Sequence, residues 1–249
     1  MRTISLPHAE VVVFADAAEL SRAAADEFLR VASHAIRERD RFMAALAGGS
    51  TPKAVYTLLA GGGRSGAGQL DWGKVHAFFG DERHVPPDHS DSNFRMANDA
   101  LLAKVPIHVH RVRAELDAAT AASDYAAELK SAFALRSGDV PRFDLMMLGM
   151  GPDGHTASLF PGSAALEDRG ALVAANWVEK FKAYRITLTF PVLNAAEEVL
   201  FTAGGADKAE MLRSVLRGDP AGQKYPAQLV RPTAGRLLWF VDEAAARLL

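Results

Sequence analysis

The 249-residue sequence contains no cysteine, has little net charge and has no long apolar run. Without cysteine the chain can form neither a disulfide nor a thiolate metal site, and it has no cysteine nucleophile. The formal net charge of −2 gives no general positive field for nucleic acid, so an anionic ligand has to be bound by local positive groups. The first residues lack a signal-peptide core, and no segment is long enough to cross a bilayer. These absences predict a cytoplasmic protein that binds neither nucleic acid nor membrane.

The composition is that of a globular protein, with 49% hydrophobic and 23% charged residues. A chain of this length can bury one large core and is short for two. We therefore expect residues 1–249 to form a single domain.

Apolar, strand-like runs alternate with helical patterns along the chain. This alternation predicts an α/β fold with a parallel sheet and right-handed crossovers. The expected strands are 10–14, 42–47, 75–79, 109–112, 143–148, 185–190, 199–203 and 237–241. Helices are expected from an Asp16–Glu19 capping box, after Pro52, after Ser92, over 117–135 and over 210–216. The glycine-rich stretch 61–68 predicts a mobile surface loop or a flexible lid.

Ligands of open parallel sheets bind beyond the carboxyl ends of the strands, and four loops leave such ends with unusual residues. The first loop is Gly48-Gly49-Ser50-Thr51-Pro52. Its glycines allow close approach of a ligand, and free N–H groups at the following helix start can bind phosphate. A tight turn with Thr51 as helix cap explains the same residues. The loop lacks the lysine of a P-loop.

The second loop, Gly204-Gly205, precedes a helix that has Lys208 in its first turn. A cation there opposes the helix dipole, and a bound anion would remove that conflict. An exposed lysine paired with Asp207 or Glu210 is the alternative.

The third loop runs from Gly149 through Gly151 to Gly154, and His155 follows it. Asp153 can hold one imidazole nitrogen and leave the other free to take a proton from water. Alternatively, Asp153 caps a short helix and His155 packs beneath it. The density of glycine favours a functional site.

The fourth loop is Gly80-Asp81-Glu82-Arg83. Arg83 can offer a planar fork of donors to a phosphate or an oxyanion, while Asp81 or Glu82 acts as a base or holds the arginine. A charged surface loop is the plainer interpretation. Elsewhere, His108 and His110 would face one side of a strand, but without an acidic partner they make a poor metal site, and a solvated strand edge is expected. No metal or other cofactor is expected.

Together these loops resemble the 6-phosphogluconolactonase family, which belongs to a larger group that includes glucosamine-6-phosphate deaminases. The resemblance spans nearly the whole chain, and its most specific part is Asp153 to Gly162. It implies a modified Rossmann-like fold, in which helices flank a mainly parallel sheet on both faces. The matching stretches are 47–52, 80–83, 91–93, 149–162, 185–189 and 239–242.

The resemblance implies hydrolysis of 6-phospho-D-glucono-1,5-lactone, a small sugar phosphate lactone. It implies that His155 is the catalytic base, that Asp153 is the acid beside it and that Arg83 lies in the substrate pocket. Ser50, Thr51 and Lys208 match positions that contact the sugar phosphate. Gly48, Gly49, Asp81, Gly149 and Gly151 complete the expected site.

Two other functions stay open at this stage. In the deaminases a glutamate occupies the position of Phe160, and phenylalanine cannot titrate, which favours the lactonase. A non-catalytic sugar-phosphate-binding effector domain is the second alternative, although no helix-turn-helix pattern accompanies it. The family's usual Lys-Pro-Pro is Lys182-Ala183-Tyr184 here, which leaves the roles of Lys180 and Lys182 undetermined.

Overall fold

A computed structural model describes residues 1–61, 70–218 and 224–249, and an eight-stranded sheet forms its centre. The strand order is β1-β2-β11-β10-β7-β3-β4-β6. Every neighbouring pair is parallel except β1 with β2, so the expected mainly parallel sheet is confirmed. The strands are β1 (Arg2–Leu6), β2 (Ala9–Phe14), β3 (Phe42–Leu46), β4 (Val75–Phe79), β6 (His108–Val109), β7 (Leu145–Gly149), β10 (Glu198–Ala203) and β11 (Arg236–Asp242).

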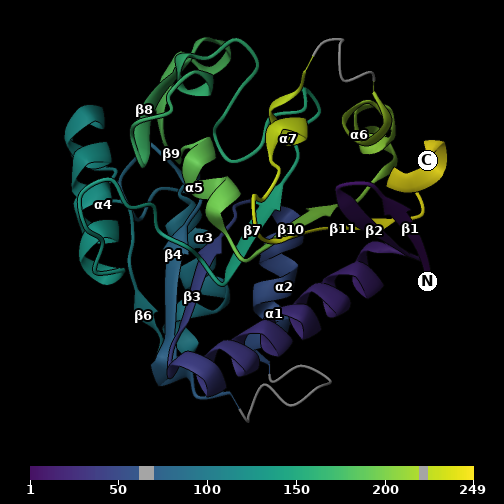
Figure 1. Cartoon of the computed structure of the whole chain (residues 1–249), viewed down its shortest axis with the longest axis horizontal. Coiled ribbons are helices and arrows are strands. Elements are labelled where there is room, and N and C mark those ends of the chain that lie inside the picture. Colours follow the sequence, from purple (N-terminus) through teal and green to yellow (C-terminus); the bar gives the residue numbers. More distant parts are fainter. Residues whose placement is uncertain (62–69, 219–223) are drawn as a thin grey trace.

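Helices cover both faces of this sheet, with α1 and α2 on one side and α5, α6 and α7 on the other (Figure 1). The Asp16 carboxylate caps α1 by accepting from the Glu19 N–H at 2.7 Å, as the capping pattern predicts. The Glu19 carboxylate accepts from the N–H of Ala15. In the expected capping box it would accept from the N–H of Asp16, so this hydrogen bond is displaced by one residue. The helices are α1 (Ala17–Arg39), α2 (Ser50–Ala60), α3 (Asn93–Ala100), α4 (Ala118–Ala132), α5 (Phe190–Ala195), α6 (Ala209–Arg217) and α7 (Pro226–Leu229).

A second, antiparallel sheet of three strands lies beside the first, in the order β5-β9-β8. Its strands are β5 (Asp81–Arg83), β9 (Ala183–Leu188) and β8 (Val173–Val178). Only Gly80 separates β5 from β4, so the chain passes directly from the large sheet to the small one. The expected strand over 185–190 is thus shifted and joins the small sheet, because an apolar run does not specify its partner.

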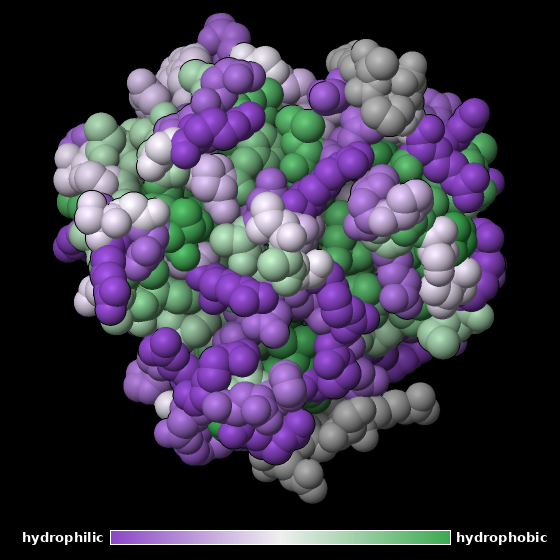
Figure 2. Space-filling model, viewed as in Figure 1, coloured by the Kyte–Doolittle hydropathy of each residue, from purple (hydrophilic) through white to green (hydrophobic). Residues whose placement is uncertain are grey.

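The buried side chains form one hydrophobic core around the large sheet, consistent with one domain. Polar side chains interrupt the apolar ones across the face shown in Figure 2. Among the described residues, no helix is long and apolar enough to span a membrane. Of the expected strand 109–112 only Val109 lies in a strand, the two-residue β6 at the sheet edge. The glycine-rich stretch falls, apart from Gly61, outside the described residues.

Candidate active site

A cavity of about 210 Å³ opens beyond the carboxyl ends of β3, β4 and β7. Strands β4 and β6, which follow β3 in the chain, are added on one side of β3 in the sheet. Strands β10 and β11, which follow β7, are added on the opposite side, so the winding direction reverses between β3 and β7. Loops diverge at such a reversal and leave a crevice. The cavity is lined by Ala47, Gly48, Gly49, Gly80, Asp81, Arg83, Asn93, Met147, Leu148, Gly149, Met150, Gly151, His155 and Ala157.

His155 and Asp153 form a close pair at this cavity. The imidazole Nδ1 lies 2.5 Å from the Asp153 Oδ1. Burial is the largest single influence on Asp153 and opposes its ionisation, but the hydrogen bonds and the charge of His155 together outweigh it and lower the pKa of that carboxyl. An ionised carboxylate accepts the Nδ1 proton, which assigns the free lone pair to Nε2. Nε2 is therefore the basic atom of the ring.

Two neighbours restrict the imidazole of His155. The ring of Phe160 stacks on it, with centroids 4.1 Å apart and planes at 25°. Gly151 is so close that a Cβ there would lie 2.0 Å from the His155 Cε1. The alternative interpretation, in which Asp153 caps a short helix and His155 packs beneath it, does not agree with the structure, because His155 lines the cavity.

Hydrogen bonds within the loop fix the backbone that carries His155. The Gly151 N–H donates to the His155 carbonyl at 2.9 Å, and the Thr156 hydroxyl donates to the Gly149 carbonyl at 2.9 Å. Gly154 adopts φ +76°, and a Cβ there would also meet the Tyr225 ring at 2.8 Å. Glycine is the residue that tolerates this backbone conformation.

The opposite wall comes from β5 and the start of α3. The buried Asp81 carboxylate accepts from the Ser158 hydroxyl at 2.5 Å and from the Asn93 amide at 3.3 Å. Arg83 donates to the Asp91 carbonyl at 2.6 Å. Asp81 therefore serves as an anchor of this wall and does not pair with Arg83.

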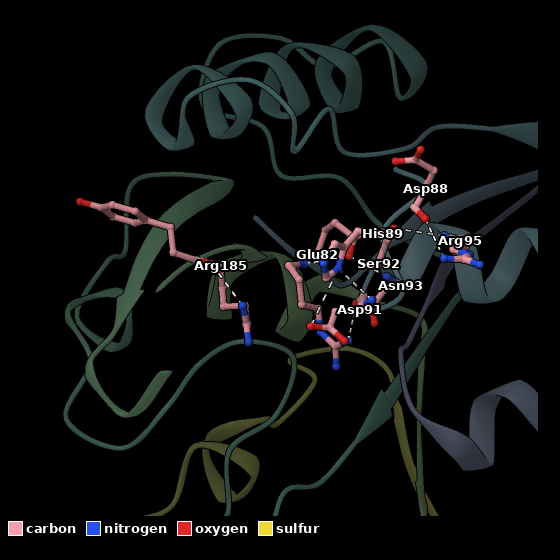
Figure 3. Close-up of polar contacts among 10 residues, drawn as sticks. Glu82, Asp88, His89, Asp91, Ser92, Asn93, Arg95 and Arg185 are labelled. Atoms are coloured by element: carbon pink, nitrogen blue, oxygen red, sulfur yellow. Dashed lines mark hydrogen bonds and ion pairs between the residues drawn. The ribbon is translucent and has the colours of Figure 1, made fainter. Parts of the chain in front are cut away.

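The buried Glu82 carboxylate ties β5 to the start of α3, where Ser92 and Asn93 lie (Figure 3). Its oxygens accept from the N–H groups of Asn93 and Phe94, each at 2.7 Å, and from the Ser92 hydroxyl at 3.1 Å. Burial raises the pKa of Glu82, although these donors oppose the shift. Of the two roles open to Glu82, the structure favours a structural one, since the carboxylate points into the hydrogen-bond network.

At the β3–α2 turn, Gly48 and Gly49 line the cavity, and Ser50 and Thr51 begin α2. The residue before the helix is Gly49, at φ +107°, and no side chain caps this helix start. The alternative of Thr51 as the cap is thus wrong. Uncapped N–H groups at a helix start remain available to an anion.

Lys208 lies on the far side of β7, in the turn Ala206–Lys208 that follows β10. Its ammonium is 3.0 Å from the Asp207 carboxylate, which is the pairing that the sequence leaves open. Lys208, Ser50, Thr51 and Asp153 are predicted site residues that are not among those lining the cavity.

Several site residues have no counterpart in the sequence-based prediction. Asn93 packs so closely on Gly48 that a Cβ on the glycine would lie 1.9 Å from the Asn93 Oδ1. Ser158 and Asn93 hold Asp81, and the only sequence signal for them is their place in the stretches that resemble the family. The histidines 76, 108 and 110 stack together at the edge of the large sheet, away from this cavity, and among the described residues no cluster of His, Asp and Glu can hold a metal ion.

Fold and site define the class of protein: a doubly wound α/β protein with an acid–histidine pair at the switch point of its sheet. Residues 15–239 match the family described as glucosamine-6-phosphate isomerases/6-phosphogluconolactonase. The chain belongs to this family.

Individual relatives agree with that assignment. The chain is 39% identical to a 6-phosphogluconolactonase of Nostoc over 239 residues, covering 94% of this chain and 96% of the relative. A solved 6-phosphogluconolactonase from Trypanosoma brucei superposes with a TM-score of 0.85 at 30% identity, covering 98% of this chain and 100% of the other. A monomeric glucosamine-6-phosphate deaminase also superposes, with a TM-score of 0.77 at 21% identity and 96% and 99% coverage, so the fold is common to both activities.

Proposed function

We propose that the chain hydrolyses 6-phospho-D-glucono-1,5-lactone to 6-phosphogluconate, the second reaction of the oxidative pentose phosphate pathway. The observation that carries the proposal is the pairing of Asp153 with His155 beside Phe160. This arrangement supplies one general base, His155. Phe160, which cannot titrate, occupies the position at which a deaminase has its second acid. The relatives named above support the same substrate. We propose the cytoplasm as the site of the reaction, with the phosphorylated substrate retained in the compartment where it is made because it does not cross membranes unaided.

His155 acts on water. Its Nε2 takes a proton as the water oxygen bonds to C1 of the lactone, while the Asp153 carboxylate stabilises the imidazolium that forms. The carbonyl oxygen of C1 becomes an oxyanion, which the Arg83 guanidinium and the N–H groups near Gly149 and Gly151 stabilise. The imidazolium then returns its proton to the ring oxygen as the bond from that oxygen to C1 breaks.

The substrate's phosphate is bound at the other end of the crevice, by the uncapped start of α2 and by Lys208. Ser50 and Thr51 add hydroxyl donors there, and Lys208 exchanges Asp207 for the phosphate. Binding energy from this remote group holds C1 against His155 and lowers the entropic part of the barrier.

Lactone decay followed by NMR, on freshly generated 6-phosphoglucono-δ-lactone, tests the proposal. The uncatalysed opening is subtracted, and we expect decay to accelerate in proportion to enzyme concentration. Ammonia release from glucosamine 6-phosphate, with no acceleration of lactone decay, would replace the proposal with a deaminase. Binding of sugar phosphate without any turnover would replace it with an effector domain.

A further inference from the structure

Arg83, which lines the cavity, faces a second arginine on the neighbouring strand. In the antiparallel pairing of β5 with β9, Arg83 stands directly opposite Arg185. Directly opposed residues have their side chains on the same face of a sheet, and like charges in such positions repel. Burial and the charge of Arg83 both lower the pKa of Arg185. The pair therefore costs stability in the folded chain.

No carboxylate compensates this repulsion by direct contact. Over the described ranges 1–61, 70–218 and 224–249, no acidic side chain is within ion-pair distance of either guanidinium. Arg83 donates to the Asp91 carbonyl, and Arg185 makes only a long contact of 3.4 Å with the Tyr184 carbonyl. Most of their donors thus remain for a ligand.

The acids close to the pair are already engaged. Figure 3 shows Arg185 beside the segment that carries Glu82 and Asn93. Glu82 accepts from the backbone of α3, and Asp81 accepts from Ser158 and Asn93. Neither carboxylate can turn to an arginine without giving up buried hydrogen bonds, which is costly.

A series of ring contacts connects Arg185 with the catalytic histidine. The Arg185 Cζ lies 5.2 Å from the centre of the Phe181 ring. Phe181 meets Phe160 edge to face at 5.7 Å, and Phe160 stacks on His155. Arg185 is thus connected to His155 through two phenylalanine rings, although it is not itself among the residues that line the cavity, whereas Lys208 follows β10 on the other side of β7.

We infer that Arg185 joins Arg83 in binding the negative charge at C1, the oxyanion of the intermediate and then the carboxylate of the product. The inference rests on the proposed function. The lactone itself carries charge only on its phosphate, so two unpaired guanidiniums at the other end match a charge that the reaction creates. Such preorganised charges lower the barrier and favour product binding.

The test compares Arg185→Met with the unaltered protein in both turnover and ligand binding. We expect kcat to fall roughly 10- to 100-fold with little change in KM, since Arg83 still contributes. Calorimetry with 6-phosphogluconate and with glucitol 6-phosphate, which has a hydroxyl in place of the carboxylate, isolates the C1 charge. We expect the Kd of the first to rise about tenfold, as for loss of one charged hydrogen bond, and that of the second to stay unchanged.

Arg169→Met is the matched control, because Arg169 also lies over a phenylalanine ring, Phe190, but away from the cavity. It should change none of these values, and thermal melting verifies that both variants are folded. Equal weakening of the two ligands, or unaltered binding of both, would overturn the assignment. If the protein binds the carboxylate ligand selectively but does not turn over the lactone, the proposed function is wrong and Arg185 remains a ligand of the C1 carboxylate. The proposed function and the assignment of Arg185 can therefore fail separately.

Discussion

Gly151 lies directly against the imidazole of His155, with no room between them for even one methyl group. With Phe160 stacked on the imidazole and Asp153 hydrogen-bonded to its Nδ1, the ring has little freedom to tilt. The general base is thus oriented by its neighbours in the loop before a substrate arrives, and preorganisation of this kind contributes to the rate.

The first prediction concerns that contact. Gly151→Ala should push the imidazole away from its position and lower kcat roughly 100-fold, because small displacements of a reacting group are costly. Steady-state kinetics on the lactone measures the effect. Gly170→Ala is the control, since a Cβ at Gly170 meets nothing within 4 Å. Normal kcat in the Gly151 variant would mean that the ring can shift without loss.

The second prediction concerns the base itself. His155→Ala should lower kcat about 10²–10⁴-fold, the usual contribution of general acid–base catalysis, while the protein stays folded. The measurement is lactone turnover with circular dichroism as a check on folding. His34→Ala, on α1 and away from the cavity, should retain full activity. Near-normal turnover without His155 would exclude it as the base.

The third prediction separates binding from chemistry. Lys208→Ala should raise KM about 10- to 100-fold and leave kcat less affected, since a charged hydrogen bond to the remote phosphate is lost. Kinetics over a range of lactone concentrations gives both values. Lys130→Ala, in the last turn of α4, should change neither. An unchanged KM would remove Lys208 from the phosphate site.

The fourth prediction concerns stability and a buried acid far from the site. Burial and the neighbouring Glu27 raise the pKa of Glu198 to about 7. In the unfolded chain this acid ionises near its ordinary value, so between about pH 4.5 and 7 the folded state binds more protons than the unfolded state. The stabilising contribution of the neutral Glu198 is therefore lost as pH rises through this window.

Glu198→Gln removes that titration. We expect the variant to lose the decline in unfolding free energy between pH 5 and 7 and to gain about 1–3 kcal/mol relative to the unaltered protein at pH 8. Urea unfolding at several pH values measures this. Glu197→Gln, at a half-buried neighbouring position, should keep the decline. An identical pH profile in the Glu198 variant would contradict the raised pKa.

Local patterns were enough to predict most of the large sheet and the loops at its carboxyl edge. The continuously apolar run at 143–148 predicted β7, and the glycines after it marked the loop that carries His155. These predictions succeed because periodicity and glycine content depend on nearby residues. The small sheet was not predicted, since strand pairing between β5 and β9 joins residues about a hundred positions apart.

The amino-acid sequence by itself determined which chemical groups are available: a histidine among glycines, an acid two residues before it and an arginine in a loop that follows a strand. Only the tertiary structure decided which of them meet. It brought Asn93 against Gly48 and placed Arg185 opposite Arg83. The physical reason is that contacts between distant segments depend on sheet register and strand order, which long-range packing of the whole core selects and which no short stretch of sequence encodes.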